Sequence, residues 1–513
     1  MLRFSVSPDG SAGGEVDFSG AYLVGSDGVP LCAEIELRDG QIVCAKQATG
    51  PAALAILWPV GKSGRVLLET TRLQERETPY ILEVELLRGR LMRLSQKREE
   101  WVLANYDFTP EQLRQVDECR DALIESFKTD DPATAAALAQ AWLERSVAVG
   151  EELALDNAGN LLNQRRQVGG FTRRVFGCAV DPRHPGEAAF KKLADAFDFA
   201  VLRMPWKLLE PTEQEFNWKP VDTCVEWLAK NRVPIKGYGL VCFNEECIPD
   251  WLYIWEHDFD TVRDLIYDHV RRVINRYGNF IQVWDVIIGI HAASCFAFSF
   301  EQLMEMTRMS VTIARQLAPQ ATVLVDLVDP WGEYYARNQQ TIPPLLYADM
   351  VVQSGIDFDG FGLNMYFGMG VDGMYVRDLF QISAMLDRFA MLGRPVHITA
   401  VQVPSANAGE QNDAWKGQMS PAAGGVWRTA WDDTVQAEWL KGFYEIALSK
   451  PFVETVSWRD LSDQGPHYLP GGGLLRADLS PKPAFGRLCE LRNSITRGAN
   501  APPQQQRKAP TAR

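Results

Sequence analysis

Two apolar runs, residues 235–242 (IKGYGLVC) and 283–288 (VWDVII), decide the fold of this chain. The segment between them is amphipathic and has helical spacing. Apolar strands that alternate with amphipathic helices indicate a parallel sheet covered by helices on its outer side. The same alternation continues in both directions, from Phe171 toward the C-terminal end.

Working outward from these runs gives eight strand candidates, at residues 175–178, 199–202, 235–242, 283–288, 323–328, 360–365, 396–401 and 456–458. Eight parallel strands with helices between them close into a (β/α)8 barrel, the TIM barrel, whose functional face lies at the C-terminal ends of the strands. The predicted fold class is therefore α/β, with the barrel over residues 169–497.

The N-terminal part of the chain has a different pattern. Apolar and polar residues alternate over residues 1–105, and Asp39-Gly40 marks a hairpin turn. Further runs at residues 54–58, 66–71 and 80–87, the last followed by a turn at Arg88-Gly89, extend this pattern. We expect a small all-β, sandwich-like domain here.

A helical arm is predicted over residues 106–168. Thr109-Pro110-Glu111-Gln112 combines an N-cap, a first-turn proline and a capping-box glutamine. Asp131-Pro132 repeats the start signal before a segment rich in alanine and leucine. These helices pack either on the barrel or on another copy of the chain. Residues 498–513, with Pro502-Pro503 and several glutamines, are expected to be disordered.

Composition narrows the class of protein. A formal net charge of -14 argues against nucleic acid as a partner, because phosphate backbones need a cationic surface. No apolar run of about 18 residues suggests a membrane span, and residues 1–6 do not begin a signal peptide, so a cytoplasmic location is predicted. The nine scattered cysteines fit reduced thiols, and the pair Cys242 and Cys247 is too sparse for a zinc site. No metal or cofactor is expected.

The barrel segment resembles glycoside hydrolase family ten, the endoxylanase family, over roughly residues 170 to 495. The resemblance rests on motifs that occur in the family's order. They are Met204, Trp206, Glu210-Pro211, Phe216-Asn217 and Asp222; Gly237-Tyr238-Gly239-Leu240-Val241 and Pro249-Asp250-Trp251-Leu252; Trp284-Asp285-Val286; Asp359-Gly360-Phe361-Gly362-Leu363; Ile398-Thr399; Gly472-Gly473-Leu474-Leu475; and Lys482-Pro483-Ala484-Phe485.

The resemblance implies a catalytic machinery that this sequence lacks. Members of the family are retaining hydrolases, in which one glutamate protonates the leaving oxygen and a second attacks the anomeric carbon. The alignment of motifs places Gly289 at the acid/base position and Ala400 at the nucleophile position. Neither side chain can donate a proton or form a glycosyl ester, so the double-displacement route is not expected at these positions.

Other sugar-contacting positions that the resemblance implies are also changed. The family's lysine before the second-strand tryptophan is Pro205, and the histidine that opens the third strand is Tyr238. The tryptophan-histidine pair that closes that strand is Cys242-Phe243, and the glutamine-x-histidine of the sixth strand is Asn364-Met365-Tyr366. Replacement on several strands at once indicates a changed function.

Acidic residues near the predicted strand ends offer an alternative. Glu245, Asp326, Asp329 and Asp460 are tentative catalytic candidates, and Glu246, Glu333 and Asp463 lie in the same loops. Two of them could form a relocated pair for inverting hydrolysis, which needs carboxyl groups about 6.5 to 9.5 Å apart. The competing interpretation is that these acids cap helices and form ion pairs in the loops.

Aromatic and amide side chains at the same end indicate sugar binding, because sugar rings stack on aromatic rings while their hydroxyls seek polar groups. The predicted substrate-binding residues are Tyr238, Trp251, Trp331, Asn364, Tyr366 and Trp458. Packing in the core or in loops is the alternative for each ring. His291 and His397 are expected to contribute little, His397 as a core histidine.

Three hypotheses follow. The first is a xylanase-like protein without catalysis that binds an oligo- or polysaccharide or acts as a scaffold. The second is a glycosidase with a relocated acid pair. The third is a structural protein that assembles with itself as a homo-oligomer, and the N-terminal β domain is either a sugar-binding module or a cap or oligomerisation surface.

Overall fold

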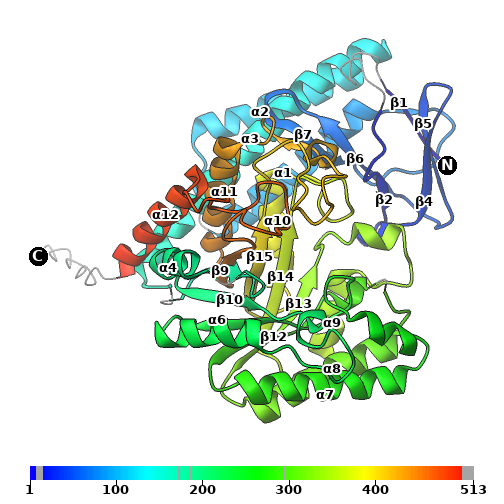
Figure 1. Cartoon of the computed structure of the whole chain (residues 1–513). Helices are drawn as coiled ribbons and strands as arrows, with labels where there is room; N and C mark the ends of the chain where they lie inside the picture. The colour runs from blue at the N-terminus through cyan, green and yellow to red at the C-terminus, as the bar shows by residue number, and fades with distance from the viewer. Residues whose placement is uncertain (7–15, 105, 172–173, 185, 294, 500–513) are drawn as a thin grey trace, which may run out of the picture.

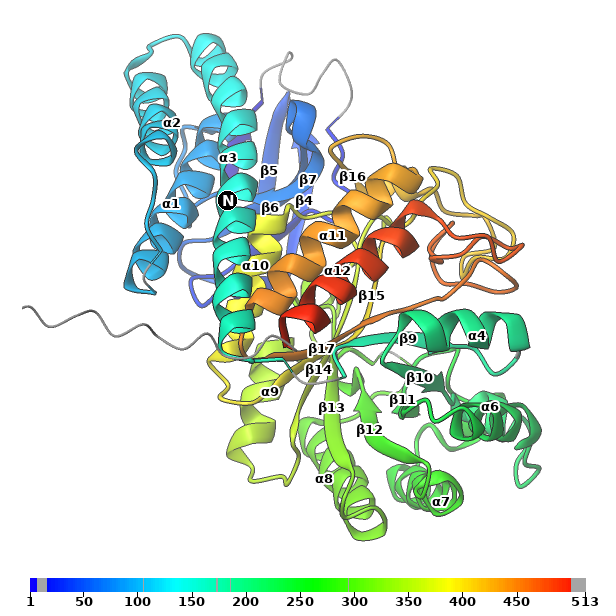
Figure 2. The same cartoon turned by 90° about the vertical axis from the view of Figure 1, so that its left-hand side faces the viewer.

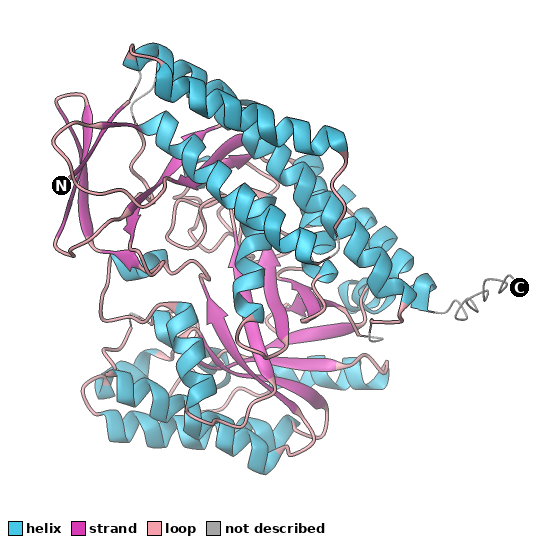
Figure 3. Cartoon of the chain, turned by 180° about the vertical axis from the view of Figure 1, so that it is seen from behind, coloured by secondary structure: helices cyan, strands magenta, loops and turns pink. Residues whose placement is uncertain are grey.

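The computed structural model of the chain describes residues 1–6, 16–104, 106–171, 174–184, 186–293 and 295–499. It places a barrel below a group of N-terminal strands and long helices (Figure 1). In the view from behind, the strands of the barrel form the centre and helices surround them (Figure 3). Among the described residues, no helix combines the length and the apolar character needed to span a membrane.

Eight parallel strands close the barrel in the order β10-β11-β12-β13-β14-β15-β17-β9. Nearly all their residues are buried, as expected for strands covered on both faces. All eight strand candidates from the sequence are confirmed. The strands are β9 Phe176–Val180, β10 Phe199–Arg203, β11 Ile235–Cys242, β12 Ile281–Ile288, β13 Thr322–Val328, β14 Gly360–Tyr366, β15 Val396–Gln402 and β17 Val453–Trp458.

Helices connect these strands on the outside of the barrel. Several begin at side chains that cap them, such as Asp258, Ser299 and Asp432. The α-helices are α4 Glu187–Ala196, α5 Trp206–Leu209, α6 Lys219–Lys230, α7 Phe259–Tyr277, α8 Phe300–Leu317, α9 Pro344–Gln353, α10 Leu379–Ala390, α11 Asp433–Ser449 and α12 Pro483–Ala499. Short 3-10 turns lie in the loops, η2 Asp250–Trp255, η3 Ile290–Ala292, η4 Glu333–Ala336 and η5 Pro421–Gly424.

Two small sheets form the N-terminal part. One has the order β4-β5-β1-β8, from Ala33–Arg38, Gln41–Lys46, Leu2–Ser5 and Tyr80–Ile81. The other has the order β16-β7-β6-β2-β3, from Val426–Trp427, Gly64–Glu69, Ala53–Pro59, Tyr22–Val24 and Pro30–Leu31, with η1 Gly61–Ser63 before β7. The predicted all-β unit is therefore present, and its second sheet takes one edge strand, β16, from the barrel's own loop.

The predicted hairpin at Asp39-Gly40 is confirmed. Both residues have positive φ, 51° and 73°, as the tight turns of β-hairpins require. This turn joins β4 to β5 in antiparallel register, with Arg38 opposite Gln41.

The predicted strand over residues 80–87 and its turn at Arg88-Gly89 are wrong. Only Tyr80–Ile81 is a strand, and α1 follows over Leu82–Leu103. Leu87, Leu91 and Leu94 are buried along this helix at the spacing of successive turns. Gly89 does not form a turn but lets α1 pack closely on the end of β7, because a Cβ at this position would lie 2.4 Å from the carbonyl oxygen of Glu69.

The predicted helical arm is present as α2 Pro110–Lys128 and α3 Pro132–Gln167. Thr109 and Gln112 form the expected capping box, and Asp131 caps α3. The arm packs on the barrel of its own chain, since α3 contacts α10, α11 and α12, which it crosses in Figure 2. The predicted disordered tail begins inside α12, and residues 500–513 lie outside the described part of the chain.

Buried polar contacts fasten the arm and α1 to the barrel. Arg90 of α1 and Asp378, the N-cap of α10, form an ion pair at 3.0 Å with both side chains about fully buried. Glu151 of α3 accepts hydrogen bonds from the backbone N–H of Leu379 and from Nε1 of Trp427. The helices therefore hold the loops at the barrel's C-terminal end in fixed positions.

Candidate functional site

A cavity of about 650 Å³ opens at the C-terminal ends of the barrel strands. Its lining includes the last residues of several strands, such as Arg203 of β10, Cys242 of β11 and Tyr366 of β14. Loop residues complete it, among them Trp415 and Tyr468. The position is the one expected for a functional site of a (β/α)8 barrel.

A network of hydrogen bonds forms one wall of this cavity. Asn364 is buried, and its Oδ1 accepts from the hydroxyls of Tyr238 at 3.0 Å and Tyr366 at 3.3 Å. Arg459 donates from Nη1 to the Tyr366 hydroxyl at 3.1 Å, and its guanidinium lies 4.5 Å from the ring centre of Tyr468. Burial raises the pKa of Tyr366 to about 12, so its hydroxyl stays protonated.

A charged cluster lies beneath the wall, inside the barrel. Lys236 and Asp285 form a fully buried ion pair at 3.0 Å. Asp326 Oδ2 accepts from Thr399 Oγ1 at 2.7 Å and from Asn364 Nδ2 at 3.1 Å. Burial and the neighbouring charge of Asp285 raise the pKa of Asp326 well above its ordinary value, although the charge of Lys236 opposes this change.

The Asp326 carboxyl depends on a glycine for its space. A Cβ on Gly362 of β14 would lie 1.2 Å from Asp326 Oδ1. Burial also raises the pKa of Asp285, to about 6, although Lys236 opposes this change. Asp326 does not line the cavity, and its contacts are those of a group that orders the barrel interior.

Of the other three tentative acids, two line the cavity and one is buried. Glu245 is exposed and lines the cavity, as does half-buried Asp329. Burial, with the charges of Glu333 and Asp372, raises the pKa of Asp329 to about 8. Asp460 is buried behind the wall, where it accepts from Gln402 Nε2 at 3.1 Å and from the Tyr468 N–H at 2.8 Å. Asp460 is thus already satisfied by the protein.

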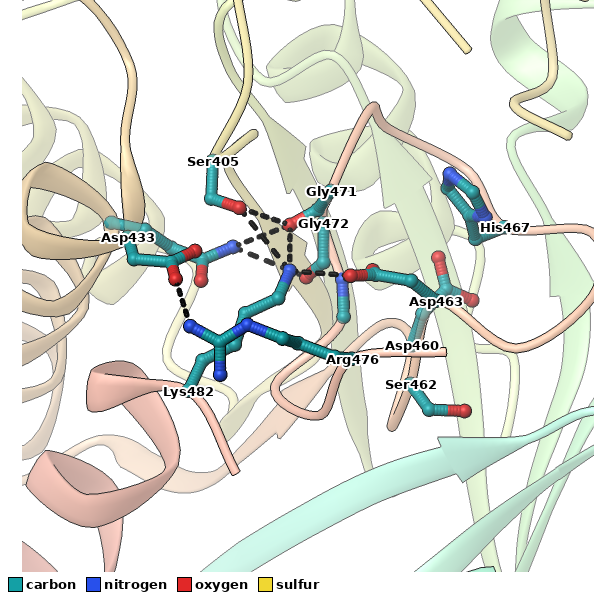
Figure 4. Close-up of polar contacts among 12 residues, drawn as sticks. Ser405, Asp433, Asp460, Ser462, Asp463, His467, Gly471, Gly472, Arg476 and Lys482 are labelled. Carbon is teal, nitrogen blue, oxygen red and sulfur yellow. Dashed lines mark hydrogen bonds and ion pairs between the residues drawn. The ribbon is translucent and has the colours of Figure 1, made fainter. Parts of the chain in front are cut away.

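Two of the neighbouring loop acids are also paired. Asp463 lies against the ammonium group of Lys482, which donates to the carbonyl oxygen of Gly471 at 2.7 Å. Figure 4 shows this ammonium group between Ser405, Gly471 and Asp463, where it fixes the loop that follows β17. Glu333 forms a buried ion pair with Arg377 at 2.6 Å. Both acids serve the packing of loops.

The six predicted sugar-binding residues lie in three different places. Tyr238, Asn364 and Tyr366 line the cavity. Trp458 is buried, with Nε1 donating to the Gly472 carbonyl oxygen, and Trp251 donates to the Glu210 carbonyl oxygen and packs against Trp206. Trp331 lines a different, second cavity.

Of the two histidines noted in the sequence, His291 is buried and His397 is half-buried. His291 Nδ1 is 2.6 Å from the Tyr334 hydroxyl, and His397 Nδ1 is 3.0 Å from Thr455 Oγ1. Burial lowers the pKa of each to about 3, so both are neutral. Neither lines the large cavity within the described chain.

Sequence reasoning missed Arg459, Trp415 and Tyr468. Arg459 directly follows Trp458 at the end of β17, and this position alone could have identified it. Trp415 and Tyr468 come from long loops that fold back over the opening, where their rings lie 5.3 Å apart. Neither residue lies close after a strand pattern, so the sequence did not predict that they line the cavity.

Gly289 and Ala400 carry no acid into this region. Gly289 directly follows β12, lines the cavity and has a φ of 59°. A Cβ there would lie 2.9 Å from Cγ1 of Val328. Ala400 of β15 is buried in an apolar cluster with Tyr366 and Met374. The backbone and the packing therefore fit small residues at both positions.

Comparison with known proteins identifies the barrel. A family model described as glycosyl hydrolase family 10 matches residues 168–487. The chain belongs to glycosyl hydrolase family 10. Its match covers the barrel and leaves most of the N-terminal strands and the helical arm outside family 10.

Relatives within family 10 are distant. The chain is 23% identical to endo-1,4-beta-xylanase B of Thermotoga neapolitana over 307 residues, which are 56% of this chain and 78% of that protein. It is 19% identical to endo-1,4-beta-xylanase C of Paenibacillus barcinonensis, over 44% of this chain and 22% of that one. The solved structure of native xylanase 10B from Thermotoga maritima superimposes with a TM-score of 0.47 and 18% identity, covering 63% of this chain and 97% of that one.

Proposed function

We propose that this member of family 10 binds an oligo- or polysaccharide in the large cavity and does not carry out retaining hydrolysis. Three features support binding: the phenols of Tyr238 and Tyr366, the amide of Asn364, and the half-buried ring of Trp415, all of which line the cavity. Hydroxyl and amide groups suit sugar hydroxyls, and aromatic rings suit the C–H faces of sugar rings.

The observation that carries the non-catalytic part is Gly289. Retaining hydrolysis requires two carboxyl groups about 5 to 5.5 Å apart, and the family resemblance assigns the acid/base to this position. The left-handed backbone of Gly289 and its contact with Val328 leave little room for a longer side chain. Ala400, at the assigned nucleophile position, is buried in one apolar cluster with Tyr366 and Met374.

Calorimetric titration of the whole protein with xylohexaose, and with other neutral oligosaccharides, tests this proposal. We expect binding with no release of reducing ends over days. Trp415→Ala should weaken binding at least fivefold, whereas Tyr267→Phe, on the exposed face of α7, should leave it unchanged. Hydrolysis by the pure protein would overturn the non-catalytic part, and an equal affinity of the Trp415→Ala variant would overturn the assignment of the site.

A second candidate is inverting hydrolysis by a relocated acid pair, and one observation favours it. Asp329 lines the cavity, and its pKa of about 8 makes it a proton donor at neutral pH. Glu245 is an exposed carboxylate in the same lining. Asp326 and Asp460 fit this role less well, because protein groups already occupy their carboxyls.

If hydrolysis of any glycan is found, Asp329→Asn and Glu245→Gln should each reduce the rate by about 10² or more. Asp250→Asn is the matched control, because Asp250 is an exposed acid outside the cavity that pairs with Lys207. Unchanged rates in both cavity variants would exclude this pair.

A further inference from the structure

A second cavity, of about 340 Å³, lies where the N-terminal sheet meets the barrel. Five segments form it: β2 with the turn to β3, the end of β7 with the residues after it, helix α1, the loop after β13, and helix α10 of the barrel. Trp331, which follows β13, and Phe380 of α10 contribute aromatic surface. The cavity is separate from the opening at the C-terminal ends of the strands, because the two share no lining residue.

Two guanidinium groups converge in this cavity on the turn between β2 and β3. Gly28 lies in that turn with a φ of 81°, and a Cβ built on it would lie 3.7 Å from Nη2 of Arg388 and 3.9 Å from Nη2 of Arg72. Arg93 of α1 also lines the cavity. The missing side chain of Gly28 leaves the space between the two guanidinium groups open to a ligand.

The acids of this cavity do not balance its cations. Glu69 is held by Arg93, which donates to its side chain and backbone, and by Arg72 at 4.0 Å. Asp27 Oδ1 accepts a hydrogen bond from the backbone N–H of Val29. Three arginines therefore face two carboxylates, which leaves one positive charge.

Arg388 is the cation left over. Among the residues that the structure describes, its side chain has neither a hydrogen bond nor an ion pair. Its surroundings lower its pKa, first through burial and then through the charge of Arg72, although Glu69 opposes both. Part of the side chain remains exposed at the mouth. Two like charges held close together with one shared acid favour the binding of an anion between them.

The neighbouring Arg377 does not add to this charge. It is fully buried, its Nη2 donates to Glu333 Oε1 at 2.6 Å and to the Tyr22 hydroxyl at 3.0 Å, and its guanidinium lies 4.5 Å from the ring centre of Trp331. Trp331 is thereby fixed in place at the wall of the cavity. Its position gives the cavity an apolar surface beside Arg388 and beside Arg72, whose Nε donates to the Gly25 carbonyl oxygen at 3.2 Å.

We propose that this second cavity is a binding site for a small anionic molecule, whose carboxylate or phosphate group bridges Arg72 and Arg388. Guanidinium groups match the planar, multidentate geometry of both anions. Trp331 and Phe380 would contact the remainder of the molecule, for which an acidic or phosphorylated sugar has a suitable size. Because the lining comes from both parts of the chain, a bound anion joins the N-terminal sheet to α10.

Titration of the full chain tests the site, with inorganic phosphate, glucuronate, glucose 6-phosphate and neutral glucose as probes at constant ionic strength. A few charge-assisted hydrogen bonds should give at least one anion a dissociation constant on the order of 1 mM or lower. That anion should also raise the unfolding temperature of the protein. Neutral glucose should neither bind nor change the unfolding temperature. Binding of glucuronate alone would assign a carboxylate ligand, and binding of phosphate and glucose 6-phosphate a phosphorylated one.

Arg388→Gln should lower the affinity for the anion at least tenfold. The residue lies at the mouth and makes no described contact that the fold requires, so circular dichroism should show a folded variant. Arg271→Gln is the matched control, because Arg271 is a surface arginine of α7 that pairs with Asp268. The proposal fails if no anion binds the folded wild type, or if Arg388→Gln and Arg271→Gln bind it equally well.

Discussion

Nη1 of Arg459 lies 3.1 Å from the hydroxyl oxygen of Tyr366, and this hydroxyl in turn donates to Oδ1 of Asn364 at 3.3 Å. One phenol thus accepts from a buried cation and donates to a buried amide. All three groups lie in the wall of the large cavity. The wall is therefore preorganised by hydrogen bonds that do not depend on a ligand.

Tyr366→Phe removes the acceptor that Arg459 uses and the donor that Asn364 uses. We expect the free energy of unfolding to fall by about 1 to 3 kcal/mol, the usual cost of leaving a buried polar group without its partner. Urea unfolding of the variant beside Tyr267→Phe, an exposed tyrosine of α7, measures this loss. Equal unfolding midpoints for both variants would contradict the role of the Tyr366 hydroxyl.

Gly289→Ala should destabilise the protein. The left-handed backbone costs a residue with a Cβ about 1 to 2 kcal/mol, and the methyl group would also press on Val328 at 2.9 Å. Gly486→Ala in α12 is the matched control, because a Cβ there meets nothing within 4 Å and alanine favours helices. If thermal unfolding shows that Gly289→Ala is as stable as Gly486→Ala, the backbone at the end of β12 does not require glycine.

The sequence predicted the barrel well because each strand is buried on both faces, which leaves a continuous apolar run such as residues 283–288. It misjudged residues 80–87 because Leu82 to Leu87 alternate as a strand would, while the residues beyond them have helical spacing. The spacing of apolar residues over these eight positions could not distinguish a strand from a helix. The longer apolar face of α1, packed on α3, decides it in the structure.

The candidate site was predicted in part. Tyr238, Asn364 and Tyr366 were found because strand ends of a barrel meet at one face. Trp458 and Trp251 follow the same rule in sequence, yet their indole N–H groups bond to backbone carbonyls and neither ring lines the cavity. Such tertiary partners come from distant segments, and no local pattern reveals them.

Arg90→Met should cost the protein about 3 to 5 kcal/mol of stability, because Asp378 would remain buried without its cation. The double variant Arg90→Met with Asp378→Asn should lose less than Arg90→Met alone, since it leaves no buried charge and asparagine still caps α10. Chemical unfolding of these two variants and of Asp378→Asn alone completes the cycle that measures the coupling, with Arg271→Met on the surface of α7 as the control. Additive losses in the double variant would show that the pair is not coupled.

Asp329 makes the stability of the protein depend on pH. Its pKa is about 8 in the folded chain, against an ordinary value of 3.8, because of burial and the charges of Glu333 and Asp372. The folded chain therefore holds this proton more tightly than the unfolded chain, so the contribution to stability is complete below about pH 3.8 and disappears as pH rises through 8. Asp329→Asn removes the proton linkage. Relative to wild type, its unfolding temperature should rise steadily between pH 5 and pH 9, and parallel curves for the two proteins would show that Asp329 does not titrate in this range.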